Sequence, residues 1–376
     1  MTEIRLFTPG PTPVPERVRK ATALPMIHHR SPEFAAILTS VRTRLKSLCD
    51  CDGEVVLFPS SGTGGMEATV GSLFSPGEEV VVVEGGRFGE RWTELAHHFK
   101  LSVKVVSVEW GKSARVEEVM KALTPKTRGI LMQGAESSTG AYHPLSQMGE
   151  VLRGRNDILW VVDAITTLGV HDVSMQRDRI DALIGASQKA LMSPPGLSCV
   201  GLSPRALEKL EKSSSQNFYF SLQREVRMQA KGEAGFTPAI SLVRGLHAAL
   251  GMMEEEGKEK IFARHRKMQQ MARAALREDG LKLFNRDEEA TWGITVVEAP
   301  EGTDLKTWLN TLKQKEGLWL AGGQGKLSEK IFRLSHMGAV TPVELLSAIE
   351  TIEGSLASTY PQAAKHSGYR KAKLLL

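Results

Sequence analysis

From about residue 54 onward, short apolar and β-branched runs alternate with amphipathic stretches, the pattern of strands and helices in turn. Strands are predicted at 54–58, 80–83, 103–108, 129–133, 158–162, 181–186 and 197–202, and helices at 64–74, 87–99, 116–123 and 144–152. This alternation predicts an α/β fold with a largely parallel sheet sandwiched by helices. Ligands in such sheets bind beyond the carboxyl ends of the strands, so chemistry is expected just after each apolar run.

A different pattern follows and predicts a second, smaller α/β domain. It comprises a long helical region at 240–278 broken near Gly257, a strand at 292–297, a helix at 305–313, strands near Leu318 and Ile331, and a helix after Pro342. We therefore expect an N-terminal arm at 1–20, a large domain at 21–257, a small domain at 258–358 and a basic tail at 359–376. Prolines at 9, 11, 13 and 15 favour an extended arm, and the aperiodic tail is expected to be mobile.

Length and composition agree with a soluble globular protein of two domains, since the chain has 376 residues, 41% hydrophobic and 24% charged. The net charge of +5 would suit nucleic acid, an anionic membrane or small anionic substrates. Basic residues cluster only in the tail, without the interleaved aromatic residues of nucleic-acid-binding modules, so nucleic acid is disfavoured. The sequence has neither a signal peptide nor an apolar run of the ~18 residues that a membrane span needs. We expect a cytoplasmic protein with no membrane partner.

The cysteine content disfavours both a disulfide framework and a zinc site. The three cysteines are Cys49, Cys51 and Cys199, an odd and sparse set with no second Cys or His pair beside Cys49-Asp50-Cys51. Reduced thiols and no bound metal are therefore expected.

The first candidate for chemistry is the loop Pro59 to Gly65, between a predicted strand and a predicted helix. Its glycines let the backbone approach a ligand, and the helix start offers unpaired N–H groups. Ser61 and Thr63 add hydroxyl groups, so the loop resembles a phosphate cradle, although no Gly-Lys-Ser/Thr sequence follows it as in a Walker loop. A plain glycine- and serine-rich loop is the alternative.

Two further candidates lie at predicted strand ends. Asp163 ends a buried strand, where a carboxylate needs a donor or a cation, and it could equally be a structural cap. Lys189 follows the strand 181–186 among small and apolar neighbours, and partial burial would make its neutral amine available. A phosphate cradle, an acid for a pyridinium nitrogen and an imine-forming lysine are together what pyridoxal 5′-phosphate (PLP) requires of a protein.

At these positions the sequence resembles the class V aminotransferases of the type I PLP fold, and within them the alanine–glyoxylate and serine–pyruvate aminotransferase branch. The resemblance extends to about residue 355. It is carried by Thr8-Pro9-Gly10-Pro11-Thr12-Pro13, His28-His29-Arg30-Ser31-Pro32, Ser61-Gly62-Thr63, Glu136-Ser137-Ser138-Thr139-Gly140, Val162-Asp163, Ser187-Gln188-Lys189-Ala190 and Arg333.

The resemblance implies a role for each matching residue. Lys189 would carry PLP as a Schiff base and transfer a proton at the substrate Cα, and Asp163 would pair with the pyridine nitrogen. Ser61, Gly62, Thr63 and Gln188 would hold the phosphate, Ser137 would lie near the phenolic oxygen, and Ile165 would pack under the ring. Arg333 would receive the substrate carboxylate, for which a bidentate guanidinium is suited.

Three positions depart from the family pattern. Phe88 stands where many members stack a tryptophan on the ring. The stretch 232–238 lacks the tyrosine that members often lend to the partner's phosphate, and Thr237 is the candidate to replace it. The basic tail has no counterpart.

The resemblance implies a homodimer that transfers an amino group from alanine or serine to glyoxylate or pyruvate by a ping-pong mechanism. One alternative is a related PLP activity such as cysteine desulfurase, which the absence of any cysteine after residue 199 disfavours. Another is a non-catalytic subunit that retains the fold, as relatives labelled as hydrogenase subunits suggest.

Overall fold

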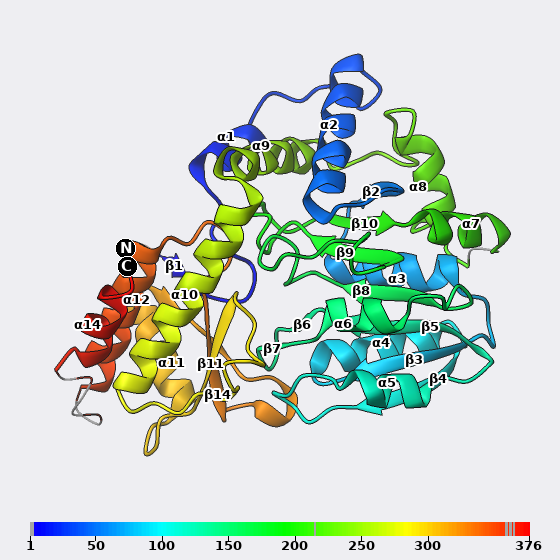
Figure 1. The fold of residues 1–376 in the computed structure, drawn as a ribbon. Coiled ribbons are helices and arrows are strands. Elements are labelled where there is room, and N and C mark those ends of the chain that lie inside the picture. The colour runs from blue at the N-terminus through cyan, green and yellow to red at the C-terminus, as the bar shows by residue number, and fades with distance from the viewer. Residues whose placement is uncertain (1–3, 214–215, 358–359, 361–362, 364) are drawn as a thin grey trace.

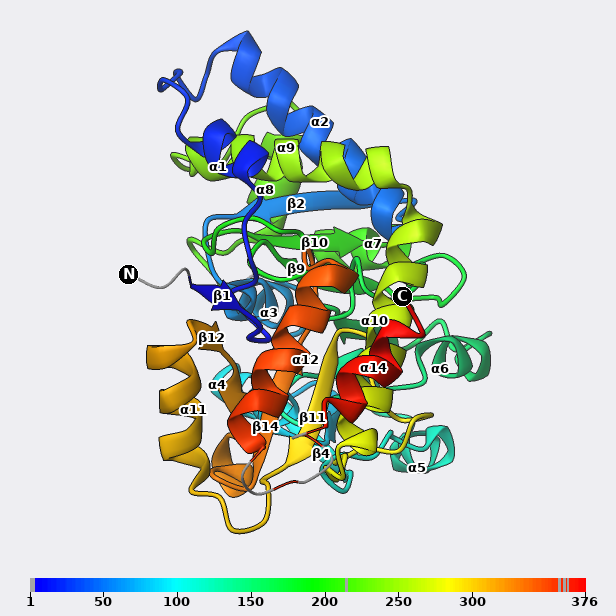
Figure 2. The same ribbon diagram turned by 90° about the vertical axis from the view of Figure 1, so that its left-hand side faces the viewer.

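The fold is known from a computed structural model, which describes residues 4–376 except 214–215, 358–359, 361–362 and 364. A large part built on one twisted sheet lies beside a smaller part built around a three-stranded sheet (Figures 1 and 2). The large sheet has seven strands in the order β2-β10-β9-β8-β5-β3-β4. These are β2 (Glu54–Phe58), β3 (Glu79–Glu84), β4 (Ser102–Ser107), β5 (Thr127–Gln133), β8 (Leu159–Asp163), β9 (Ala182–Ala186) and β10 (Ser198–Leu202).

The predicted α/β class with a mostly parallel sheet is confirmed. The pairs β3–β4, β3–β5, β5–β8 and β8–β9 are parallel. Strand β10 is the exception and runs antiparallel to both β2 and β9. The reversal arises because residues 187–197, between β9 and β10, form turns and no crossover helix.

Helices cover both faces of the large sheet because its strands are apolar on both sides. Val81 and Val83 pack in one core, whereas Val80 and Val82 pack in the core on the opposite face. The first face is covered by α2 (Pro32–Cys49), α5 (Val116–Ala122), α6 (Leu145–Val151) and α9 (Ile240–Glu256). The second is covered by α3 (Gly62–Leu73), α4 (Arg87–His98), α7 (Pro204–Lys212) and α8 (Leu222–Gln229).

The long helical region breaks at Gly257, where the sequence predicts a break, and the smaller part follows. This glycine has φ 87°, a left-handed conformation that ends α9 before α10 (Lys258–Glu278) begins. After α10 come β11 (Ile294–Glu298), α11 (Leu305–Lys315), β12 (Leu318–Trp319), β13 (Ala321–Gly322), a 3-10 turn (Gly325–Leu327), β14 (Ile331–Ser335) and α12 (Pro342–Leu356). None of the helices within the described residues combines the length and the apolar character that crossing a membrane requires.

Both ends of the chain pack into the smaller part. In the arm, β1 (Arg5–Leu6) pairs with β12, and Phe7 enters the core of the smaller part. The arm continues into α1 (Glu16–Thr22) beside α9, so its last residues are helical and not extended (Figure 2).

The expectation that the tail lacks regular structure is wrong for residues 367–373. Helix α14 (Ser367–Lys373) lies against α10 and α12 (Figure 1). Gly368 and Ala372 are its buried residues, and the N–H of Gly368 donates to the Asp279 carboxylate at 2.8 Å. The first part of the expected tail includes positions outside the described residues.

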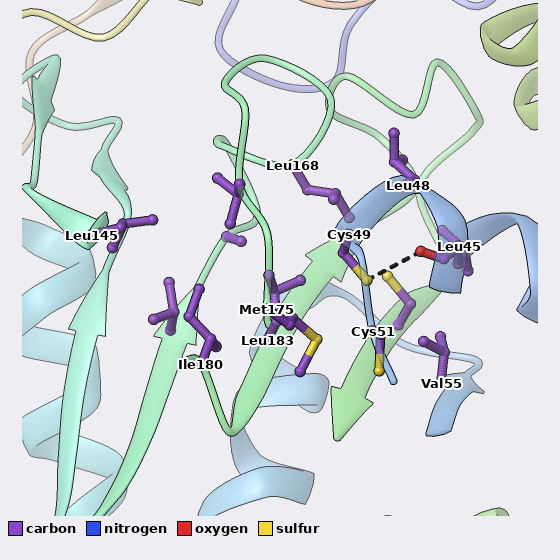
Figure 3. Close-up of a cluster of buried hydrophobic side chains, with 14 of the residues drawn as sticks. Leu45, Leu48, Cys49, Cys51, Val55, Leu145, Leu168, Met175, Ile180 and Leu183 are labelled. Carbon is purple, nitrogen blue, oxygen red and sulfur yellow. Dashed lines mark hydrogen bonds between the residues drawn. The ribbon is translucent and has the colours of Figure 1, made fainter. Parts of the chain in front are cut away.

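The three cysteines are free and buried in the large part. Figure 3 shows Cys49 and Cys51 among leucine and valine side chains, where the Cys49 thiol donates to the Leu45 carbonyl at 3.1 Å. Burial raises the pKa of Cys199 to about 12, which keeps this thiol protonated. These side chains act as small apolar core residues.

A further pair of short strands, β6 (Ala135–Glu136) and β7 (Ala141–Tyr142), forms a hairpin after β5. Its turn contains Ser137 and Ser138, and a backbone bond from Thr291 N–H to Gly140 O at 2.9 Å ties it to the smaller part. The hairpin therefore links the carboxyl edge of the large sheet to the smaller part.

Candidate active site

Lys189 lies in the turn after β9, and the N-terminal arm covers it. Its Nζ donates to the Pro9 carbonyl at 2.7 Å, and Thr12 Oγ1 donates to the Lys189 carbonyl at 2.8 Å. At Gly10, which has φ 156°, a Cβ would stand only 2.3 Å from Nζ. The glycine in the arm is therefore required for the arm to approach the amine.

The environment of Lys189 favours the neutral amine. The pKa of Lys189 is lowered to about 8, mainly by burial and also by the positive charges of Arg333 and Arg91, while Asp163 opposes the change. A pKa near neutrality makes the amine available both as a nucleophile and as a base.

Asp163 is the last residue of β8, next to β9 in the sheet, so its carboxylate and Lys189 share one edge. Burial raises the pKa of Asp163 to about 7, and the neighbouring Glu136 adds to the increase. The N–H of Ile165, which donates to Asp163 Oδ1 at 2.8 Å, opposes that increase together with Lys189 and Arg91. Among the residues that the structure describes, no cation forms an ion pair with this carboxylate.

The glycine-rich loop forms the start of α3, with Ser61 as N-cap, and the Ser61 side chain does not cap the helix. A Cβ on Gly62 would stand 2.2 Å from Ile165 Cδ1, so only glycine lets the loop approach Ile165. Thr63 Oγ1 accepts a hydrogen bond from Arg91 at 3.2 Å. Exposed Ser61 and half-buried Thr63 leave hydroxyls and helix N–H groups beside Ile165 and Asp163.

A buried carboxylate positions Phe88. Glu136 accepts from the N–H groups of Phe88 and Gly89, both at 3.0 Å, and from the Ser138 hydroxyl at 2.5 Å. Burial raises the pKa of Glu136, and these donors oppose the change. Phe88 is half-buried at the start of α4, with the guanidinium of Arg91 4.8 Å from its ring centroid.

Arg333 lies on β14 of the smaller part and reaches back to the β6–β7 turn. Nη1 donates to the Ser137 carbonyl at 2.9 Å, and Nε and Nη2 donate to the Gly322 carbonyl at 3.0 and 2.7 Å. Burial lowers the pKa of Arg333 to about 10. Its hydrogen-bond partners are neutral carbonyls, and the charge of Glu136 only partly opposes this decrease in pKa.

The structure brings Lys189, Asp163, Ile165, Gly62, Thr63, Phe88, Ser137 and Arg333 into one network of contacts and charges. Gln188, beside Lys189, has a buried Oε1 without a partner among the described residues. Thr237 differs, because it is exposed in the segment before α9 and no contact within this chain joins it to Lys189.

Comparison with known proteins gives this arrangement its family. The sequence model of the aminotransferase class-V family matches residues 5–334. The chain belongs to the class V aminotransferases.

Individual class V relatives cover nearly the whole chain. The chain is 36% identical to the soluble hydrogenase 42 kDa subunit of Anabaena cylindrica over 93% of its own length and 92% of that protein. It is 32% identical to the L-aspartate–glyoxylate aminotransferase of Paracoccus denitrificans, with 94% and 91% covered. Among solved structures, a subgroup IV aspartate aminotransferase of Thermus thermophilus superposes with a TM-score of 0.88 at 33% identity, covering 94% of this chain and 99% of that one. The fold is therefore the type I PLP-dependent transferase fold that the sequence predicts.

Class V aminotransferases are PLP-dependent transaminases, and the residues at this site suit that group. The loop at Gly62 and the arm at Gly10 are places where a Cβ would collide, as expected where backbone lies close around a flat ligand. The unpaired Gln188 amide offers a hydrogen bond, because its oxygen and nitrogen ends can be exchanged. A buried acid, a lysine of lowered pKa and free helix N–H groups complete a suitable donor set.

Two residues that contact this site were not singled out from the sequence. Glu136 appeared only as part of a matching stretch, yet its carboxylate fixes the start of α4. Arg91 contacts both Phe88 and Thr63. Its position three residues after Phe88 on a helix is a signal that could have found it, since such residues share a face.

Proposed function

We propose that this chain is a PLP-dependent transaminase whose cofactor is held on Lys189. The observation that carries the proposal is that Lys189 and Asp163 meet at the ends of adjacent strands, with Arg333 close enough to shift the pKa of the lysine. Ser61, Gly62, Thr63 and Gln188 would hold the phosphate at the start of α3. Phe88 and Ile165 would pack on the ring faces, and Ser137 would lie near its phenolic oxygen.

When bound, PLP supplies an electron sink for the charge left at the substrate Cα. Lys189 would hold the cofactor and, as an amine with a pKa of about 8, would move the proton at the substrate Cα. The Asp163 carboxylate would hold the proton on the pyridine nitrogen by hydrogen bond and charge. That pairing would lower the pKa of Asp163 in turn, because a cation beside a carboxylate favours its ionised form.

Arg333 would orient the substrate through its carboxylate. A guanidinium has five N–H donors, and the Gly322 and Ser137 carbonyls occupy three of them, so one remains on Nη1 and one on Nη2. Two parallel donors match a carboxylate. The carbonyl partners also fix the side chain before the substrate arrives.

For the substrates we propose alanine or serine as amino donor and glyoxylate or pyruvate as acceptor, in a ping-pong cycle. Aspartate is a second candidate donor, because a similar protein is named for aspartate and glyoxylate and a similar structure for aspartate. A second positive charge besides Arg333 supports aspartate, which carries a second carboxylate. Arg91 is near enough to shift the pKa values of both Lys189 and Asp163.

The deciding experiment measures product formation from alanine, serine and aspartate against glyoxylate and pyruvate, with protein that has been saturated with PLP. The proposal expects a visible cofactor absorbance, its bleaching by at least one donor, and parallel double-reciprocal plots. Protein that gains no such absorbance after PLP addition contradicts the proposal.

A non-catalytic role is the alternative, because the Anabaena cylindrica relative is named as a hydrogenase subunit. Lys189→Ala separates the two possibilities. A transaminase loses turnover and covalent cofactor in this variant, whereas a binding-only subunit would behave unchanged. Cysteine desulfurase activity is disfavoured, because all three thiols are buried in the core of the large part.

We also propose a homodimer, in which Thr237 contributes to the partner's phosphate site. Thr237 is exposed, next to Phe236, which stacks on the partly exposed Tyr219 with ring centroids 4.9 Å apart. Light scattering gives the subunit number, and Thr237→Ala should weaken PLP binding only in the dimer. The cytoplasmic location stays a prediction of the sequence.

A further inference from the structure

A second cavity lies in the smaller part, away from Lys189. Its volume is about 720 Å³, and none of the residues proposed for the PLP site lines it. Its walls come from α10, the loop before β11, the end of the β6–β7 hairpin, His171 in the loop after β8, and the C-terminal segment that contains α14. Lys371 and Leu375, from the expected tail, close one side.

One wall of this cavity is strongly cationic. Arg266, Arg273 and Arg277 lie seven and four residues apart on α10, a spacing that places them on one helix face. Lys371 adds a fourth positive charge from α14, and Asp287 and Glu288 are the acids in the lining. The wall therefore carries a surplus of positive charge.

Arg273 has an unused hydrogen-bond donor. Its side chain is 3% exposed, and it uses Nε on Asp287 and Nη2 on the Asn285 carbonyl. Its Nη1 has no hydrogen-bond partner among the described residues. Asp287 cannot neutralise it fully, because that carboxylate also accepts both Nη atoms of Arg277 at 2.8 Å. A buried guanidinium N–H without an acceptor is unfavourable, and a bound oxyanion would satisfy it.

Aromatic rings form another part of the cavity lining. Tyr142 stacks on His171 with ring centroids 4.0 Å apart, and His171 stacks on Trp292 at 4.3 Å. Arg266 lies over the Trp292 ring, 5.7 Å from its centroid. These stacked rings hold one another in place, and a planar group can pack on an end face of the column or against its ring edges.

We propose that this cavity is a binding site for a small planar anion, a ring that bears a phosphate or a carboxylate. The oxyanion is held by Arg273 Nη1 with Arg277 and Lys371, and the ring packs against the Tyr142–His171–Trp292 column. The site is separate from the transamination chemistry and does not depend on it. Order in α14 is part of the site, since Lys371 and Leu375 complete it.

The test titrates PLP-saturated protein with phenyl phosphate, benzoate, inorganic phosphate and benzyl alcohol by calorimetry. Saturable binding of phenyl phosphate or benzoate is expected, about tenfold or more tighter than that of inorganic phosphate or benzyl alcohol. The stronger of the two ring anions identifies the charged group. Absence of saturable binding by both ring anions overturns the proposal, and inorganic phosphate binding as tightly as phenyl phosphate overturns the role of the rings.

Substitutions in the cavity lining test whether the anion binds there. Arg277→Gln and Lys371→Gln remove exposed charges from the lining and should each weaken the preferred ring anion about tenfold. Lys260→Gln, an exposed residue of α10 outside the lining, is the matched control and should leave affinity unchanged. Arg273 is left intact, because it also holds Asp287 and Asn285. If Arg277→Gln and Lys371→Gln bind as tightly as the control while Arg333→Lys does not, the anion occupies the transaminase site and the proposal is wrong.

Discussion

The molecule buries positively charged side chains in two regions, and the two regions differ in the negative charges that face them. At Lys189 the charges of Arg91 and Arg333 face the buried carboxylates Asp163 and Glu136, and the pKa of Lys189 falls to about 8. In the α10 cavity Arg273 shares one exposed carboxylate with Arg277. A lysine can lose its proton and do chemistry, whereas arginines stay charged and can only bind. The first region therefore suits proton transfer, and the second suits the anion binding that we propose.

Asp163→Asn should have the largest effect on catalysis in the first region and none on the second. Asparagine keeps an oxygen for the Ile165 N–H but cannot balance a protonated pyridine nitrogen. We expect kcat for transamination to fall about 10²- to 10³-fold, the scale of losing one preorganised electrostatic contact. Steady-state kinetics of the PLP-saturated variant measure it. Arg277→Gln in the second region is the control, and an equal loss there would mean that the two regions are not independent.

Arg333→Lys tests whether the cation of the first region also binds. Lysine keeps the charge but loses the two parallel donors, so we expect KM for the amino donor to rise about tenfold to a hundredfold. Since the contact is made before and during the reaction, kcat should change much less. A drop in kcat at constant KM would instead assign Arg333 to the chemical step.

The pH dependence of cofactor capture tests the tuned lysine. Only the neutral Lys189 amine attacks an aldehyde, and its pKa is lowered from 10.5 to about 8. The capture rate by cofactor-free protein, followed by absorbance, should therefore rise about tenfold per pH unit below 8 and level off above it. A rate that keeps rising through pH 10 would show an ordinary lysine. In Asp163→Asn the profile should move to lower pH, because Asp163 raises the pKa of Lys189.

Sequence reasoning predicted the large sheet well, because each of its strands is a short apolar run and the runs alternate with helices. It placed Lys189 and Asp163 after such runs, and the resemblance added their partners. It missed what depends on tertiary contacts. Strand β10 reads like its neighbours yet runs antiparallel, and nothing local in the sequence distinguishes the two directions.

The tail was missed for a similar reason. Helix α14 has only seven residues and is rich in lysine and arginine, so it looks like a solvated end. Its order comes from Gly368 and Ala372, whose small size lets it pack closely on α10 and α12, and such a fit is visible only when the partners are known. The Arg273 cavity was missed with it, because its lining comes from segments far apart in the sequence.

Gly368→Ala should have the smallest effect on catalysis, yet it should displace α14 from the second region. A Cβ there would stand 2.3 Å from Asp279 Oδ2 and 2.5 Å from the Ala275 carbonyl, so α14 must shift away from α10. We expect the free energy of unfolding to fall by about 1–3 kcal/mol, as for overpacking in a core, with transaminase kcat within about twofold of the original. Gly354→Ala on α12 is the matched control, because nothing lies within 4 Å of a Cβ at that position. Denaturant unfolding measures the free energy of unfolding of both variants. If Gly368→Ala is as stable as Gly354→Ala, α14 does not depend on this close contact, and the argument that α14 is held in place to supply Lys371 to the cavity fails.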